Sequence, residues 1–171
     1  MTSRQRVLAA IGDYIDVMCM GDDLASQGGL IMSPELYRRL IKPRHAEAYA
    51  YIKKRTKARI FHHTCGAVYP LIGDLVDIGL DILNPIQPRA RGMEQERLKR
   101  EFGSRLCFWG GIDIQHTLPM GTPEQIRAEV QEAVRVLGRG GGYVLGPAHN
   151  VQSDVDPRNL VLMAETAAGS R

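Results

Sequence analysis

The chain has 171 residues, of which 44% are hydrophobic and 24% are charged, and its formal net charge at pH 7 is +3. This length is enough for one domain with its own hydrophobic core, and the composition is typical of a globular protein. The basic residues are scattered through the predicted helices among acidic ones, as in residues 97–101. They do not form the clustered patch that indicates a nucleic-acid-binding protein.

No apolar run approaches the roughly 18 residues needed to cross a bilayer. The N-terminus lacks the basic segment and apolar segment of a signal peptide. The chain has three cysteines, an odd number, and they are widely spaced, which argues against a disulfide framework. We therefore expect a cytoplasmic protein with neither a membrane nor a nucleic-acid partner.

Predicted strands and helices alternate along the chain. The apolar segments that read as strands are residues 14–20, 58–63, 81–84, 106–109 and 143–145. The segments with helical spacing are residues 34–56, 68–78, 93–102, 122–137 and 157–168. Ser33 and Pro34 mark the start of the first helix, because serine caps a helix and proline suits its first turn. Pro43 should bend or break that helix, because proline has no N–H to donate.

Short apolar strands that are each followed by a helix are typical of a buried parallel sheet. Polar and glycine residues follow the strands, and in a (β/α)₈ barrel the active site lies at that end. We interpret the chain as one domain over residues 1–171, forming about five βα units of a partial (β/α)₈ barrel. A doubly wound open sheet is the alternative. However, the glycines at 140–142 precede a strand, so they do not form a dinucleotide-binding loop.

A candidate metal site lies at the end of the strand at 58–63. His63 and Cys65 are two residues apart, and such residues point to the same face of a strand. An imidazole and a thiol that converge there are suitable ligands for Zn²⁺, which prefers histidine nitrogen and cysteine sulfur over the oxygen ligands of Mg²⁺ or Ca²⁺. His62, by the same alternation, should face the other way and be structural.

Three carboxylates also follow predicted strands and are candidate catalytic residues. Asp22 and Asp23 follow the first strand, and Asp113 follows the fourth. Each could bind substrate or orient a metal-ligating imidazole. The alternative for each is that it only caps a turn or a helix.

The remaining cysteines and a helical histidine have simpler interpretations. Cys19 and Cys107 lie within apolar strands, so both are expected to be buried as small hydrophobic side chains. His45 lies on the first predicted helix and is expected to face solvent. His116 follows Asp113 and could line the pocket.

Several segments of this chain resemble the uroporphyrinogen decarboxylase superfamily in order and spacing. They are residues 21–24, 31–37, 61–66, 81–87, 109–113 and 154–159. Members are (β/α)₈ barrels of about twice this length. The resemblance covers nearly the whole chain but only the C-terminal half of the barrel, roughly strands four to eight.

One branch of this superfamily contains zinc-dependent methyltransferases that act on corrinoid proteins and thiols such as coenzyme M. These enzymes bind zinc through a His-x-Cys pair and a distant cysteine. His63 and Cys65 match the pair, and His149 falls on the third position, where it replaces the cysteine. The resemblance therefore implies Zn²⁺ as cofactor, a small-molecule thiol as substrate, and a methyl donor such as a corrinoid on a partner protein.

Two alternatives remain open. The other branch is the decarboxylase of haem biosynthesis, which removes acetate carboxyls from a tetrapyrrole without a metal, but it lacks the His-x-Cys-Gly sequence on this strand. The third possibility is a non-catalytic half-barrel subunit of a split enzyme. Because a half-barrel leaves sheet edges open, we expect a homodimer or pairing with a missing N-terminal half.

Overall fold

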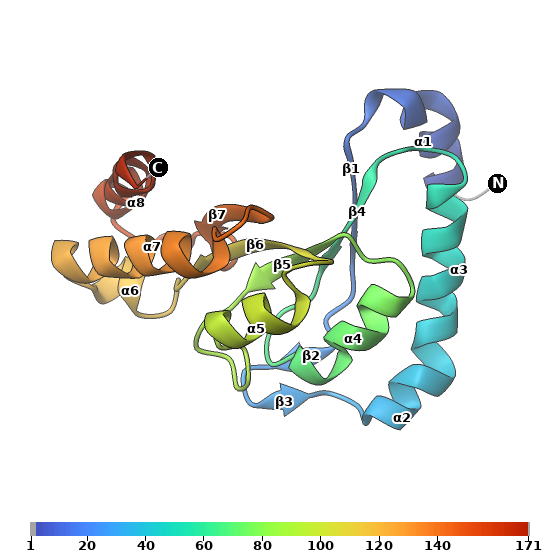
Figure 1. Cartoon of the computed structure of the whole chain (residues 1–171), viewed down its shortest axis with the longest axis horizontal. Helices are drawn as coiled ribbons and strands as arrows, with labels where there is room; N and C mark the ends of the chain where they lie inside the picture. The colour runs from blue at the N-terminus through green and yellow to red at the C-terminus, as the bar shows by residue number, and fades with distance from the viewer. Residues whose placement is uncertain (1–2, 171) are drawn as a thin grey trace.

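The computed structural model describes residues 3–170 and contains a five-stranded parallel sheet in the order β1-β4-β5-β6-β7 (Figure 1). The predicted domain, 1–171, includes residues 1, 2 and 171, which lie outside the described part. The sheet strands are β1 (Val17–Gly21), β4 (Arg59–His63), β5 (Ile82–Ile86), β6 (Cys107–Ile112) and β7 (Tyr143–Pro147). A small antiparallel pair, β2 (Ala25–Ser26) and β3 (Gly29–Leu30), follows β1.

Most of the helices connect one strand of the sheet to the next along the chain. They are α1 (Ser3–Ile11), α2 (Pro34–Leu36), α3 (Lys42–Lys53), α4 (Tyr69–Asp77), α5 (Gln95–Phe102), α6 (Thr117–Met120), α7 (Pro123–Leu137) and α8 (Pro157–Gly169). A 3₁₀ turn (Gly12–Tyr14) precedes β1, and a π-helical turn (Tyr37–Ile41) joins α2 to α3.

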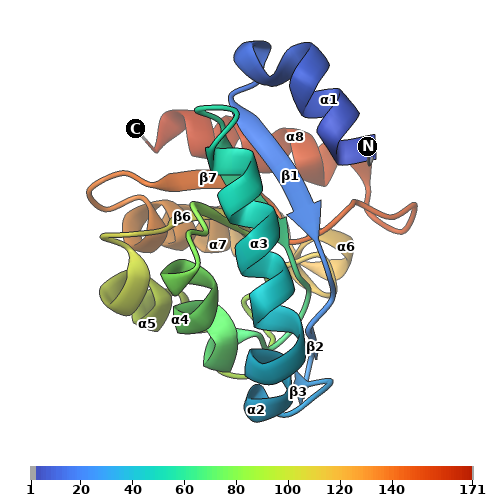
Figure 2. The same cartoon turned by 90° about the vertical axis from the view of Figure 1, so that its right-hand side faces the viewer.

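Each sheet strand lies next to the one that follows it along the chain, without a reversal of order. Right-handed crossovers then place the connecting helices on one face of the sheet. Figures 1 and 2 show α3, α4 and α5 along this outer face. A doubly wound sheet requires a reversal of strand order, which is absent among residues 3–170. The predicted partial (β/α)₈ barrel is therefore confirmed as the fold class.

The core lies between the sheet and these helices. Ile60, Leu83 and Phe108 point from three neighbouring strands into this layer and are fully buried. Among residues 3–170, no helix layer covers the opposite, concave face (Figures 1 and 2). Phe61 and Trp109 are therefore only half-buried there, and they contact each other edge to face. The two faces of the sheet thus differ because only one of them is covered.

Helix α7 begins where its sequence predicts. Thr122 accepts a hydrogen bond from the backbone N–H of Gln125, the side chain of Gln125 accepts one from Thr122, and Pro123 fills the first turn. This reciprocal capping satisfies N–H groups that the helix itself cannot. Pro43 likewise lies in the first turn of α3, directly after the π-helical turn, so the helix changes its hydrogen-bonding pattern just before the proline and does not break there.

Other predicted boundaries need correction. The first strand begins at Val17 and not at residue 14, because β4 offers pairing partners only from Arg59 onward. Tyr14 instead ends the 3₁₀ turn, and its side chain is 87% exposed. Strand β5 continues through Pro85 to Ile86. Helices α1 and α6 and the β2–β3 pair were not predicted, because each is short or lacks a clear apolar period.

Two predictions of burial are wrong. Cys19 is exposed, because β1 is an edge strand and Cys19 shares the uncovered concave face with its partner Phe61. His45 is buried, because α3 turns it toward the sheet, where it contacts the ring of His62. His62 itself is buried and bonded to the hydroxyl of Tyr49, as expected for a structural residue. Cys107, which was also expected to be buried, is half-buried, so that prediction holds only in part.

Within residues 3–170, none of the helices has the length and the apolar character that a membrane crossing requires.

The difference between the two faces predicts different costs of truncation. Ile60→Val removes a methylene from the buried core and should lower the free energy of unfolding by about 0.5–1.5 kcal/mol. Cys19→Ala should change it by less than about 0.5 kcal/mol, because the side chain is exposed. Urea unfolding followed by circular dichroism measures both. A larger loss for Cys19→Ala than for Ile60→Val would contradict this account of the fold.

Candidate metal centre

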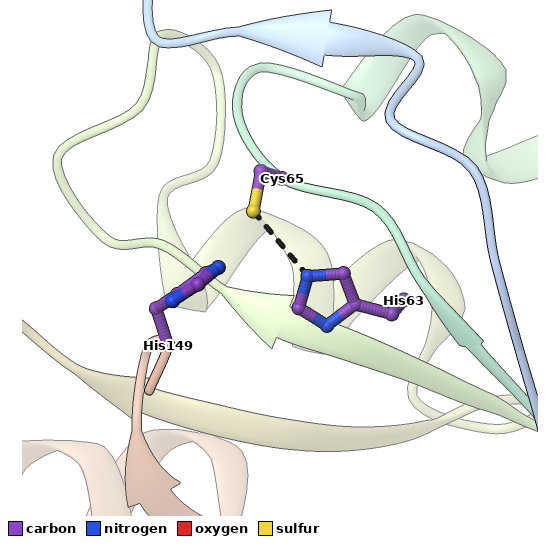
Figure 3. A group of neighbouring side chains, drawn as sticks. All are labelled: His63, Cys65 and His149. Atoms are coloured by element: carbon purple, nitrogen blue, oxygen red, sulfur yellow. Dashed lines mark hydrogen bonds between the residues drawn. The ribbon is translucent and has the colours of Figure 1, made fainter. Parts of the chain in front are cut away.

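Three side chains from distant parts of the chain meet at the carboxyl-terminal rim of the sheet. His63 is the last residue of β4, Cys65 lies in the loop that follows it, and His149 lies in the loop after β7. One ligand atom from each lies within 4.8 Å of the others. Figure 3 shows the three side chains directed toward a common point. The parallel sheet brings them together, because all its strands end at this rim.

The distances within the cluster can be compared with those of a zinc site. The Cys65 Sγ atom lies 3.5 Å from Nε2 of His63, and the rings of His63 and His149 are 5.4 Å apart between centroids. Ligand bonds of about 2.0–2.3 Å in tetrahedral geometry place two donors roughly 3.3–3.8 Å apart. The Cys65–His63 pair lies in this range, and the ligand atom of His149 lies within 4.8 Å of both. The three residues therefore fit Zn²⁺ in number and chemistry, and would leave one coordination position open.

Asn84 on β5 contacts the His63 ring from the other side. Its Oδ1 atom lies 2.8 Å from Nδ1 of His63, and its Nδ2 atom donates to the carbonyl oxygen of Trp109 at 3.4 Å. With Nδ1 engaged by this amide, the Nε2 atom of His63 is the nitrogen that faces Cys65.

The turn that carries Cys65 is fixed by two side chains. Oδ1 of Asp23 accepts a hydrogen bond from the Cys65 N–H at 3.0 Å. Oε1 of Gln87 accepts one from the Gly66 N–H at 2.7 Å. Gly66 has φ of +82°, and a Cβ atom there would lie 2.3 Å from the carbonyl oxygen of Ser26, so the position requires glycine.

Without a cation, the thiol of Cys65 is held in its neutral form. Burial, followed by the nearby carboxylate of Asp23, raises the pKa of Cys65 to about 11. A bound metal would act in the opposite direction, because it favours the thiolate.

The three candidate carboxylates have different positions. Asp23 supports the His63–Cys65–His149 cluster through the backbone of Cys65. Asp22 accepts a hydrogen bond from Nε2 of the buried His45 at 2.8 Å, on the helix side of the sheet, and its side chain is 64% exposed. Its backbone N–H donates to the carbonyl oxygen of His63 at 3.1 Å, but the hydrogen bond described for its carboxylate goes to His45 and not to the three clustered side chains.

Asp113 is buried and caps the turn that leads into α6. Its carboxylate accepts hydrogen bonds from three consecutive backbone N–H groups. Arg89 lies 3.8 Å from it, beside a cavity of about 420 Å³ that Asp113 helps to line. His116 is exposed on the same turn. The contacts of Asp113 are therefore those of a residue that caps a turn. None of its described contacts reaches His63, Cys65 or His149.

Sequence reasoning did not select Asn84 or Gln87 as functional residues. Asn84 closes the predicted strand at 81–84, and Gln87 follows shortly after it. Both therefore belong to the rim where the candidate site was expected. Their position after a strand was the available signal, but only the fold gives their contacts.

An incomplete parallel βα barrel with a histidine–cysteine cluster at its carboxyl-terminal rim defines a class of half-barrel proteins with a candidate metal centre. The chain belongs to the uroporphyrinogen decarboxylase (URO-D) family, whose model matches residues 4–169.

Curated relatives are similar over most of this chain. A uroporphyrinogen decarboxylase of Chlorobium luteolum is 26% identical over 94% of this chain and 46% of its own length. One of Chlorobium phaeobacteroides is 27% identical over 93% of this chain and 43% of its own length. The chain thus spans about half the length of the curated relatives it matches.

A solved structure has the same fold. A methyltransferase from Methanosarcina mazei superposes with a TM-score of 0.72 at 24% identity, over 90% of this chain and 42% of its own. This likeness confirms the architecture of a partial barrel.

The environment of Cys65 predicts its reactivity. In protein treated with a chelator, Cys65 should react slowly with iodoacetamide at pH 8, because a pKa of about 11 leaves only about a thousandth of it as thiolate. Its labelling should accelerate as the pH rises toward 11. Peptide mapping by mass spectrometry measures this, with the exposed Cys19 as an internal comparison. Equal labelling of both cysteines at pH 8 would contradict the prediction.

Proposed function

We propose that this protein takes part in zinc-dependent methyl transfer to a thiol, using His63, Cys65 and His149 as the metal ligands. The observation that carries the proposal is their convergence, with ligand atoms within 4.8 Å of one another. Membership of the URO-D family and the structural likeness to a protein named a methyltransferase support it.

The donor set suits this chemistry. Bound Zn²⁺ would lower the pKa of a substrate thiol at the open coordination position, so that the thiolate is available at neutral pH. Two neutral imidazoles and one thiolate contribute a single negative charge. A substrate thiolate beside them would be less electron-rich than beside a centre with two cysteines.

The chain itself positions the reactants. His63 and Cys65 hold the metal from β4 and its loop, and His149 approaches from the loop after β7. Phe61 lies on the same face of β4 as His63, and together with Trp109 it forms an apolar wall below the rim. This wall would exclude water from a thiolate and from the methyl group that it attacks. The methyl donor in this proposal is a corrinoid or similar group on a partner.

A tetrapyrrole decarboxylase is the second candidate. It is favoured by the curated relatives, which bear the name uroporphyrinogen decarboxylase. Such a reaction would not need the His–Cys–His cluster, so chelators would leave it unchanged. Loss of acetate carboxyls from uroporphyrinogen, measured with and without a chelator, distinguishes the two functions.

Either activity requires the open side of the sheet to be covered. Among the described strands, β1 and β7 each pair on one side only, so two parallel edges are free. Val144 on β7 is 38% exposed and pairs with Trp109 on the concave face. We infer that another polypeptide, or a second copy of this chain, covers this face. The cytoplasmic location and the absence of a nucleic-acid partner remain predictions.

Zinc content tests the proposed function first. Purified protein should carry about one zinc per chain, as expected for a single site with three protein ligands. Cys65→Ser should lose it, because a hydroxyl is a much poorer zinc ligand than a thiolate. Cys107→Ser is the matched control and should keep the metal, since Cys107 lies within β6 and outside the cluster. Inductively coupled plasma mass spectrometry measures the metal. A well-folded wild-type protein that binds no zinc would contradict the proposal.

Association of the concave face is tested separately. Sedimentation velocity should show the chain self-associating at micromolar concentration. Val144→Glu should weaken this association at least about tenfold, because it places a charge in an apolar interface. Val161→Glu is the matched control, since Val161 is 56% exposed but lies on the outer helix α8. A chain that is monomeric at all concentrations, or equal effects of the two substitutions, would count against self-association.

A further inference from the structure

We propose that Asn84 is the positioning residue of the metal centre: its side chain keeps the proton of His63 on Nδ1 and directs the Nε2 lone pair toward the metal position. This inference rests on the proposed function for its purpose. The contacts of Asn84, however, are present in the protein without any metal.

The sheet register makes Asn84 and His63 neighbours. They are directly paired residues of the parallel strands β4 and β5. The backbone N–H of Thr64 donates to the carbonyl oxygen of Asn84 at 2.7 Å, which fixes the two strand ends together. The amide and the imidazole therefore meet through paired backbone, and not through two mobile side chains.

The orientation of the amide is determined by its second contact. Nδ2 of Asn84 donates to the carbonyl oxygen of Trp109 at 3.4 Å, which leaves Oδ1 facing Nδ1 of His63 at 2.8 Å. A flipped amide would place two oxygens against each other at Trp109. Because Oδ1 can only accept a hydrogen bond, Nδ1 of His63 must carry the proton.

This assignment decides which nitrogen can coordinate a metal. A neutral imidazole has one N–H, so a proton on Nδ1 leaves the lone pair on Nε2. That atom faces the Sγ atom of Cys65 at 3.5 Å (Figure 3). In many metal sites the second nitrogen of a ligating histidine is held by such an acceptor. Without Asn84, the proton could move to Nε2, where it would block coordination.

His149 provides an internal comparison. Its ring contacts His63 edge to face, but none of the hydrogen bonds found within residues 3–170 involves its side chain. Asn84 therefore controls only one of the two histidine ligands. Its loss should alter His63 and leave the tautomers of His149 unchanged.

The test begins with metal-free protein labelled with ¹⁵N-histidine. Long-range ¹H–¹⁵N spectra at pH 8 should show His63 with its proton on Nδ1 in the wild type and a mixture of tautomers in Asn84→Ala. Asn84→Asp should retain the wild-type pattern, because its carboxylate still accepts from Nδ1. Asn150→Ala is the matched control, since Asn150 is exposed and adjacent to His149.

The same variants are then titrated with Zn²⁺ against a chromophoric chelator. Asn84→Ala should bind about 10–100-fold more weakly than wild type, whereas Asn84→Asp and Asn150→Ala should bind within a fewfold of it. If Asn84→Ala does not fold, Asn84→Leu replaces it, because leucine has a similar volume and no acceptor.

The outcomes separate the two proposals. An unchanged His63 tautomer together with unchanged zinc affinity in Asn84→Ala or Asn84→Leu would overturn the role of Asn84. A wild-type protein that binds no zinc would overturn the proposed function. In that case the tautomer comparison still decides whether Asn84 fixes His63.

Discussion

The pairing of β4 with β5 is the constraint on which the candidate centre depends. It sets His63 opposite Asn84 and ties the start of the following loop to β5. That loop carries Cys65, whose N–H donates to Asp23. The next residue, Gly66, donates to Gln87 and has a conformation that requires glycine. A shift of one residue in this register would turn His63 to the other face of the sheet.

Successive side chains of β4 point to opposite faces of the sheet, so two neighbouring histidines have different environments. His63 points to the open rim, whereas His62 is fully buried against α3 and bonded to Tyr49. Burial, together with the nearby His45, lowers the pKa of His62 to about 4, so it stays neutral. His45 is in turn bonded to Asp22 and Tyr37. This polar network fastens α3 to the sheet behind the candidate metal ligands.

The uncovered concave face links the fold to the proposed function. The face that leaves Cys19 exposed also carries the apolar pair Phe61 and Trp109 below the cluster. In an eight-stranded barrel such side chains fill the interior. The same residues that would surround a substrate therefore also form the surface that another polypeptide would have to cover.

The sequence by itself determined the alternation of strands and helices, the parallel sheet, and the convergence of His63 and Cys65, because these follow from local periodicity and strand geometry. The assignment of His149 came from a resemblance, since nothing local links it to residues more than 80 positions earlier. Only the tertiary structure decided that Asn84 faces His63 and that Asp22 is hydrogen-bonded to His45. It also decided that Asp113 caps a turn and that Cys19 is exposed. Each of these depends on which strand or helix lies next to the residue, and a single sequence read along its length does not contain that information.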